Sequence, residues 1–91
     1  MKVLTKGSGN FTMRKFTIKP KGYTPLHNHK WEHEIYVLSG NGYLLHKKAN
    51  LLKKTKLAAG IFAYILPFEM HQFINNSKKD FEFICVVPGK K

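Results

Sequence analysis

The stretch His27-Asn28-His29-Lys30-Trp31-Glu32-His33-Glu34, followed by the apolar run Ile35-Tyr36-Val37-Leu38, decides how the rest of this 91-residue chain is interpreted. It places three histidines and two carboxylates directly before a stretch typical of a β-strand. His71 lies far along the sequence, inside a second apolar stretch. One local cluster combined with one distant ligand is a common arrangement in metal sites, so the sequence predicts such a site.

The spacing of the histidines fits coordination of a single ion. In a strand, residues i and i+2 face the same way about 6.6 Å apart, so His27 and His29 can direct both rings at one metal with bonds of ~2.1 Å. His33 and Glu34 follow a short loop and point to opposite faces of the next strand, so only one of them can share the site. Strand parity alone leaves both open as the third ligand, with His71 as the fourth.

The rest of the chain has the pattern of an all-β protein. Short stretches rich in Phe, Tyr, Ile and Val alternate with Gly, Pro, Asn and Lys, and no apolar period of a helix is sustained. We expect strands at 11–18, 26–29, 33–38, 43–46, 51–56, 62–66, 71–74 and 81–87. Ser39-Gly40-Asn41-Gly42 is predicted to be a hairpin turn, because Asn-Gly tolerates positive φ. The pattern predicts one domain over 1–91, a small antiparallel barrel or jelly roll at 11–88 preceded by a flexible or edge-strand N-terminus at 1–10.

These residues resemble the two sequence motifs of the cupin superfamily. The first motif has Gly, a spacer, His-x-His, a Glu three or four residues later and another Gly; the second has Gly, Pro-x-Gly, His and Asn. The matching residues are Gly22, His27, His29, His33 or Glu34, Gly40, Gly60, Pro67, His71 and Asn75. The first spacer is one residue shorter, the second is one residue longer, and Glu69 stands where the second motif has its Gly. The resemblance implies a cupin β-barrel, a double-stranded β-helix, over nearly the whole chain.

A closer resemblance is to a group of very small bacterial and archaeal cupins that bind manganese through four histidines. They carry His-x-His-x-Trp-Glu-His-Glu before an Ile-aromatic-Val-Leu run, and Pro-x-Glu-x-His, as residues 27–38 and 67–71 do here. This match implies His33 as the third ligand, with Glu34 as the alternative found in the common cupin site. It implies one divalent transition metal per chain, manganese first, with Fe, Cu, Ni or Zn as alternatives that also suit imidazole donors.

The resemblance implies a metalloenzyme, with an oxidoreductase of the dioxygenase type as the leading expectation. Four protein ligands on a six-coordinate ion leave two positions for water, dioxygen or a chelating substrate. One alternative is a metal-dependent isomerase or epimerase of a sugar or keto acid, which would need Glu34 or Glu69 as its general base. Another is a non-catalytic cupin that only binds a small molecule, because fold does not determine chemistry.

Further residues are candidates for a pocket around the metal, although each also suits a core position. These are Trp31, Tyr36, Phe73, Phe83 and Cys85. Glu32 and Glu69 are loop carboxylates that could orient an imidazole through its second nitrogen. His46 has no place in either motif and precedes a pair of lysines, so we expect it to be exposed to solvent.

The chain is strongly basic, with 16 lysines and arginines against five acidic residues and a net charge of +11. Arg14 is the only arginine. Proteins that recognise nucleic acids usually employ arginine as well, because its planar fork matches phosphate and guanine edges. Since the lysines fall in pairs in expected turns, we predict that they lie in solvent and protect the edges of strands. A preference for an anionic small-molecule substrate is the second interpretation. We predict no specific nucleic-acid binding.

The small size of the chain favours a partner. A domain of this length buries only about 60–65% of its unfolded surface, so a metal or a second copy is expected to add stability. The segment 81–87 is apolar on both faces, which predicts a homodimer with Ile84 and Val86 at the contact. The lone Cys85 and the lack of an apolar run long enough for a signal peptide or a membrane span favour a cytoplasmic location.

Overall fold

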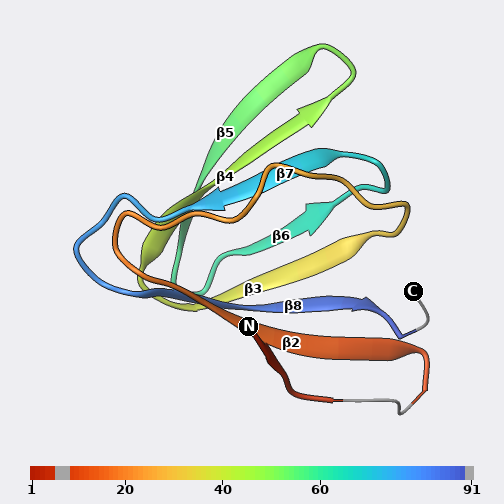
Figure 1. Cartoon of the computed structure of the whole chain (residues 1–91), viewed down its shortest axis with the longest axis horizontal. Coiled ribbons are helices and arrows are strands. Elements are labelled where there is room, and N and C mark those ends of the chain that lie inside the picture. Colours follow the sequence, from red (N-terminus) through yellow and green to blue (C-terminus); the bar gives the residue numbers. More distant parts are fainter. Residues whose placement is uncertain (6–8, 90–91) are drawn as a thin grey trace.

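The computed structural model describes residues 1–5 and 9–89, which form strands joined by turns and extended segments (Figure 1). The strands are β1 (Lys2–Val3), β2 (Phe11–Ile18), β3 (His33–Ser39), β4 (Asn41–Lys48), β5 (Leu51–Ala58), β6 (Phe62–Ile65), β7 (Met70–Ile74) and β8 (Phe81–Pro88). The described residues contain no helix, and so no helical segment among them could cross a membrane. The predicted all-β class is confirmed.

Two antiparallel sheets make up the fold. The larger has the strand order β1-β2-β8-β3-β6, and the smaller has the order β5-β4-β7. In Figure 1 the sheets lie one above the other, and the β4–β5 hairpin extends away from the larger sheet. Because β2 pairs with β8 and β4 pairs with β7, strands distant in the sequence become neighbours, as in the predicted jelly-roll barrel.

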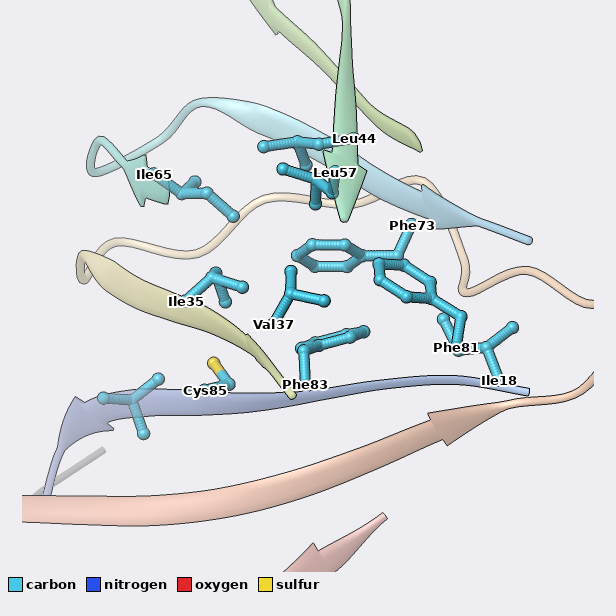
Figure 2. Packing of buried hydrophobic residues seen from close by; sticks show 11 residues of the cluster. Ile18, Ile35, Val37, Leu44, Leu57, Ile65, Phe73, Phe81, Phe83 and Cys85 are labelled. Atoms are coloured by element: carbon cyan, nitrogen blue, oxygen red, sulfur yellow. The ribbon is translucent and has the colours of Figure 1, made fainter. Parts of the chain in front are cut away.

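Alternate residues of the larger sheet point between the two sheets and form the core. Strand β8 buries every second residue from Phe81 to Val87, while the residues between them are only partly covered. Figure 2 shows side chains from β3 and β8 meeting Leu44 and Leu57 from the smaller sheet. Phe83 lies at the centre, its ring centroid 4.4 Å from that of Phe73. Burying one such ring contributes roughly 2–3 kcal/mol to stability.

The predicted hairpin at Ser39-Gly40-Asn41-Gly42 is wrong. Strands β3 and β4 belong to different sheets, and the chain turns a corner between them. Gly40 has a φ of 83°, a conformation that glycine adopts without strain. Gly42 makes room for the Phe81 ring, because a Cβ at position 42 would lie 2.4 Å from two of its carbons. The Asn-Gly pair therefore marks a change of sheet and a close packing contact.

The predicted strand at 26–29 is also wrong, although the segment that contains it runs alongside β7 (Figure 1). Its pairing consists of two isolated antiparallel bridges, Tyr23 with Ile74 and His27 with His71. Pro25 stands between the bridges and has no N–H to donate, so the ladder is interrupted there. Backbone hydrogen bonds of 3.2 and 2.9 Å join His27 to His71 in both directions and hold the two residues side by side.

Asn75 locks the end of β7 to the neighbouring segments. Its side chain is fully buried. Its Nδ2 donates hydrogen bonds of 2.8 Å to the carbonyls of Ile18 and Lys79, and its Oδ1 accepts one of 2.9 Å from the Ser77 N–H. The amide thereby joins the end of β2 to the turn that leads into β8.

Replacing Asn75 with alanine should lower the free energy of unfolding by about 2–3 kcal/mol, because buried backbone groups lose their hydrogen-bond partners. Asn76→Ala is the matched control, since Asn76 is the exposed neighbour in the same turn. It should change stability by less than about 0.5 kcal/mol. Urea denaturation followed by circular dichroism measures both variants, and equal losses would contradict this role for Asn75.

Candidate metal centre

A cavity of about 140 Å³ brings most of the candidate ligands together. Its walls are formed by Arg14, Phe16, Thr24, Pro25, His27, His29, His33, His71, Phe73, Phe83 and Cys85. Four of the chain's five histidines therefore share one cavity, although they come from the segment before β3, from β3 itself and from β7. No aspartate or glutamate is among the described residues that line it.

The four imidazole rings are close enough to form one cluster. His27, His29 and His71 are the tightest group, and one nitrogen of each lies within 4.8 Å of the others. The ring centroids of His27 and His71 are 4.7 Å apart. His33 stands next to this group, its centroid 4.8 Å from that of His71 and 5.3 Å from that of His29. The backbone bridge to β7 and the short loop at 30–32 create this convergence.

Strand β3 begins at the histidine cluster, and its first two residues, His33 and Glu34, point to opposite faces of the sheet. His33 is only 4% exposed and faces the cavity. Glu34 is exposed on the outer face of the larger sheet, in a groove that it shares with Tyr36 and Tyr64. Strand alternation therefore directs the Glu34 carboxylate away from the three other histidines.

Burial keeps His33 and His71 uncharged. Desolvation, reinforced by the nearby His71 and His29 rings, lowers the pKa of His33 to about 3. Burial also lowers the pKa of His71, although a backbone hydrogen bond opposes the shift. Both rings are therefore neutral near pH 7, the protonation state that binds a metal. Nδ1 of His33 is buried without a hydrogen-bond partner in the described part of the chain, which a ligand at that atom would relieve.

A backbone carbonyl orients the His71 ring. Nδ1 of His71 donates a 3.0 Å hydrogen bond to the carbonyl oxygen of Glu69, so the lone pair available to a metal is on Nε2. Among the described residues, the hydrogen bonds of the Glu32 and Glu69 carboxylates go to Tyr64, His46 and Leu66. The Glu32 carboxylate accepts a hydrogen bond from the Tyr64 hydroxyl on the outer side.

The Glu69 carboxylate binds a different histidine. It accepts hydrogen bonds of 3.0 Å from Nδ1 of His46 and from the backbone N–H of Leu66. The Thr55 hydroxyl lies 2.9 Å from Nε2 of His46. The expectation that His46 is exposed to solvent is wrong, since β4 pairs with β7 and places His46 opposite His71, with 20% of its side chain exposed. This network holds the loop that precedes β7.

Three of the five expected pocket residues line the cavity. They are Phe73, Phe83 and Cys85. Trp31 packs against the cluster, its ring stacked on that of His29 with centroids 4.4 Å apart and planes 8° from parallel. Tyr36 does not join them, because its position in β3 turns it to the outer face, where it is 49% exposed.

Arg14 lines the cavity although neither histidine motif includes it. It has the same strand parity as Phe16 and the buried Ile18, and it pairs in register with Cys85 of β8. Its Cζ atom lies 5.7 Å from the centroid of the Phe16 ring. The signal for this residue is present in the sequence, because the chain's single arginine occupies an inward position of an apolar strand.

The donor set fits a divalent transition metal. Neutral imidazole is a preferred ligand for several of these ions. His33 and His71 are buried, and the unpartnered Nδ1 of His33 in the described part of the chain is unfavourable for packing alone, because a buried ring nitrogen that lacks a hydrogen bond destabilises a fold.

The fold and the site agree with a known family. Residues 14–87 match the model of the cupin domain, so the chain belongs to the cupin family. The expected cupin membership is confirmed. A search of curated proteins finds no match.

Solved structures are similar over almost the whole chain. The polyketide cyclase RemF from Streptomyces resistomycificus has 32% sequence identity and a TM-score of 0.80, over 92% of this chain and 58% of that chain. A cupin-2 domain from Rhodospirillum rubrum has 26% identity and a TM-score of 0.87, over 98% and 58%. A cupin 2 conserved barrel domain protein from Rhodopseudomonas palustris has 26% identity and a TM-score of 0.87, over 98% and 59%. The present chain thus spans less than two thirds of the length of these structures.

Proposed function

We propose that this cupin holds one divalent metal ion through His27, His29, His33 and His71 and acts as a metal-dependent enzyme on a small organic molecule. The observation that carries the proposal is the convergence of these imidazoles on one cavity. The lowered pKa values of His33 and His71 support it, because they keep both rings in the neutral form.

Manganese is the metal that we propose first, because both histidine motifs resemble those of small cupins that bind manganese through four histidines. Imidazole donors also suit Fe, Cu, Ni and Zn, and a given site usually binds Mn more weakly than these metals. Metal supply in the cell then decides which ion is bound. Four neutral imidazoles leave a divalent site at a formal charge of +2, which favours anionic oxygen donors as additional ligands.

His33→Ala should weaken metal binding by about a hundredfold or more, whereas Glu34→Gln should leave it within about twofold. The reason is that His33 faces the cavity and Glu34 faces solvent. Calorimetric titration with Mn or Zn, together with elemental analysis of the purified variants, measures both effects. Losses in the reverse order would instead support the common cupin site of three histidines and one glutamate.

The reaction class that we propose is that of a dioxygenase. When bound, the metal would supply a Lewis-acidic, redox-capable centre with positions open to dioxygen and substrate. Phe73 and Phe83 line the cavity and give it apolar walls. The cavity volume of about 140 Å³ is close to that of engineered cavities that bind benzene, so the substrate is small.

A redox-neutral reaction is the second candidate, and the similarity to a polyketide cyclase supports it. A polycyclic substrate, however, needs more room than this cavity offers. An isomerase or epimerase needs a general base, and no carboxylate lines the cavity in the described part of the chain. Glu34 faces outward, and the Glu69 carboxylate is bonded to His46. These observations favour dioxygen chemistry.

Protein loaded with Mn or Fe should consume dioxygen when it is given a suitable small chelating substrate, screened among α-hydroxy acids, α-keto acids, catechols and 1,3-diketones. An oxygen electrode measures uptake, and isotopically labelled dioxygen should leave its label in the product. His71→Ala removes a proposed ligand and should abolish uptake. Equal turnover in the absence of oxygen would place the protein in the redox-neutral class. No turnover with or without oxygen would instead support a non-catalytic protein that only binds a small molecule.

We also propose a homodimer through the outer face of the larger sheet. Ile84 and Val86 on this face are only partly covered, and Ile84 lies opposite Tyr36 in the register. The exposed aromatic residues around them are Tyr36 (49%), Phe62 (79%) and Tyr64 (49%). A monomer rarely leaves so continuous an apolar surface in water, so a second copy of the chain is the simplest cover.

Ile84→Lys should shift the protein toward monomer and lower its thermal stability without removing its metal, because it places a charge at the centre of the proposed contact. Leu52→Lys is the matched control, since Leu52 is exposed on β5 of the other sheet. Light scattering and thermal denaturation measure both variants. A monomer observed for the unmodified protein at micromolar concentration would reject the dimer.

A further inference from the structure

Arg14 is the only lysine or arginine among the described residues that line the metal cavity. The proposed metal function leaves it without a role. Because no acidic residue balances it in these walls, the cavity is positive even when its histidines are neutral. With a divalent ion bound it would be strongly positive, and a cavity of one sign attracts ligands of the opposite sign.

Strand β2 directs Arg14 inward and the aromatic core supports it. The guanidinium lies 5.7 Å from the Phe16 ring centroid, a distance at which a cation is attracted to an aromatic face. Phe16 in turn stacks on Phe83 with centroids 5.2 Å apart and planes 10° from parallel. The next residue, Lys15, has the opposite strand parity and forms an ion pair of 3.8 Å with Glu82.

The Arg14 guanidinium has unused hydrogen-bonding capacity. Within residues 1–5 and 9–89, its buried Nε has no hydrogen-bond partner and no ion pair includes Arg14. A buried charged donor left unpaired is unfavourable, and an acceptor from a ligand would remove that cost.

We propose that Arg14 is the anion-binding residue of this cavity and that its ligand is a small organic acid, whose carboxylate pairs with the guanidinium while the rest of the molecule faces the histidines. The planar fork of arginine matches a carboxylate with two parallel hydrogen bonds. The volume of about 140 Å³ limits the ligand to roughly the size of benzene, as in keto or hydroxy acids of about three or four carbons. The inference deepens the proposed function and rests on it only for the role of the metal.

Titration with pyruvate tests the proposal in both metal-free and zinc-loaded protein. Trp31, the only tryptophan, stacks on His29 and provides a fluorescence signal beside the cavity. In both forms Arg14→Gln should weaken pyruvate binding by about tenfold or more. Lys15→Gln removes the same charge from the opposite face and should weaken binding by less than about twofold. Arg14→Lys keeps the charge without the fork, so its affinity should lie between these values.

Circular dichroism verifies that each variant is folded, and zinc affinity is measured separately on the same samples. Arg14→Gln should bind zinc no more weakly than the unmodified protein, because it removes a positive charge from the cavity. The proposal is overturned if Arg14→Gln retains full pyruvate affinity, if Lys15→Gln loses as much, or if the unmodified protein binds neither pyruvate nor lactate. Inorganic phosphate that binds as tightly as pyruvate would overturn the assignment to carboxylates. If the unmodified protein fails to bind any of the metals offered and Arg14→Gln still weakens pyruvate binding, the metal proposal fails and the Arg14 proposal stands.

Discussion

The backbone bridge between His27 and His71 is the constraint on which the rest of the site depends. Its two hydrogen bonds tie the segment before β3 to a strand more than forty positions later, and so bring the local histidines beside the distant one. Further bonds between this segment and β7, including that from the Thr24 N–H to the Phe73 carbonyl, extend the same tether. Without them His27 and His29 would lie on an unattached loop, and metal binding would have to overcome the entropy of ordering it.

The site places polar donors inside an apolar enclosure. The burial that stabilises the phenylalanine core also desolvates His33 and lowers its pKa to about 3, which leaves the ring neutral. A neutral, buried imidazole whose Nδ1 has no hydrogen-bond partner among the described residues is costly for folding and suitable for metal binding. Arg14 is also costly for folding, because an inward cation on β2 destabilises the fold unless a ligand supplies hydrogen-bond acceptors for its guanidinium. Features that conflict with local stability therefore coincide with the proposed function.

Much of the fold and the site could be predicted because both depend on local periodicity. The alternation in Phe81–Pro88 reports directly which side chains share a face, and the closeness of His27, His29 and His33 in the sequence already indicates a shared site. What could not be predicted depends on long-range pairing. The Asn-Gly pair reports a local backbone preference and says nothing of which sheet the chain enters next.

The same limit applies to individual side chains. The burial of His46 follows from the pairing of β4 with β7, and the outward position of Tyr36 follows from the way β3 is turned relative to the core. Arg14 could have been found from parity, since it alternates with Phe16 and Ile18. Its place in the cavity, however, requires the pairing of β2 with β8.

The central claim is that the four histidines bind one metal ion, and crystallography at the manganese absorption edge tests it most directly. Crystals grown with Mn should show one anomalous peak per chain, at about 2.1–2.3 Å from a ring nitrogen of each of His27, His29, His33 and His71. A fully occupied peak elsewhere, no peak at stoichiometric manganese, or a carboxylate oxygen in place of the His33 nitrogen would contradict it.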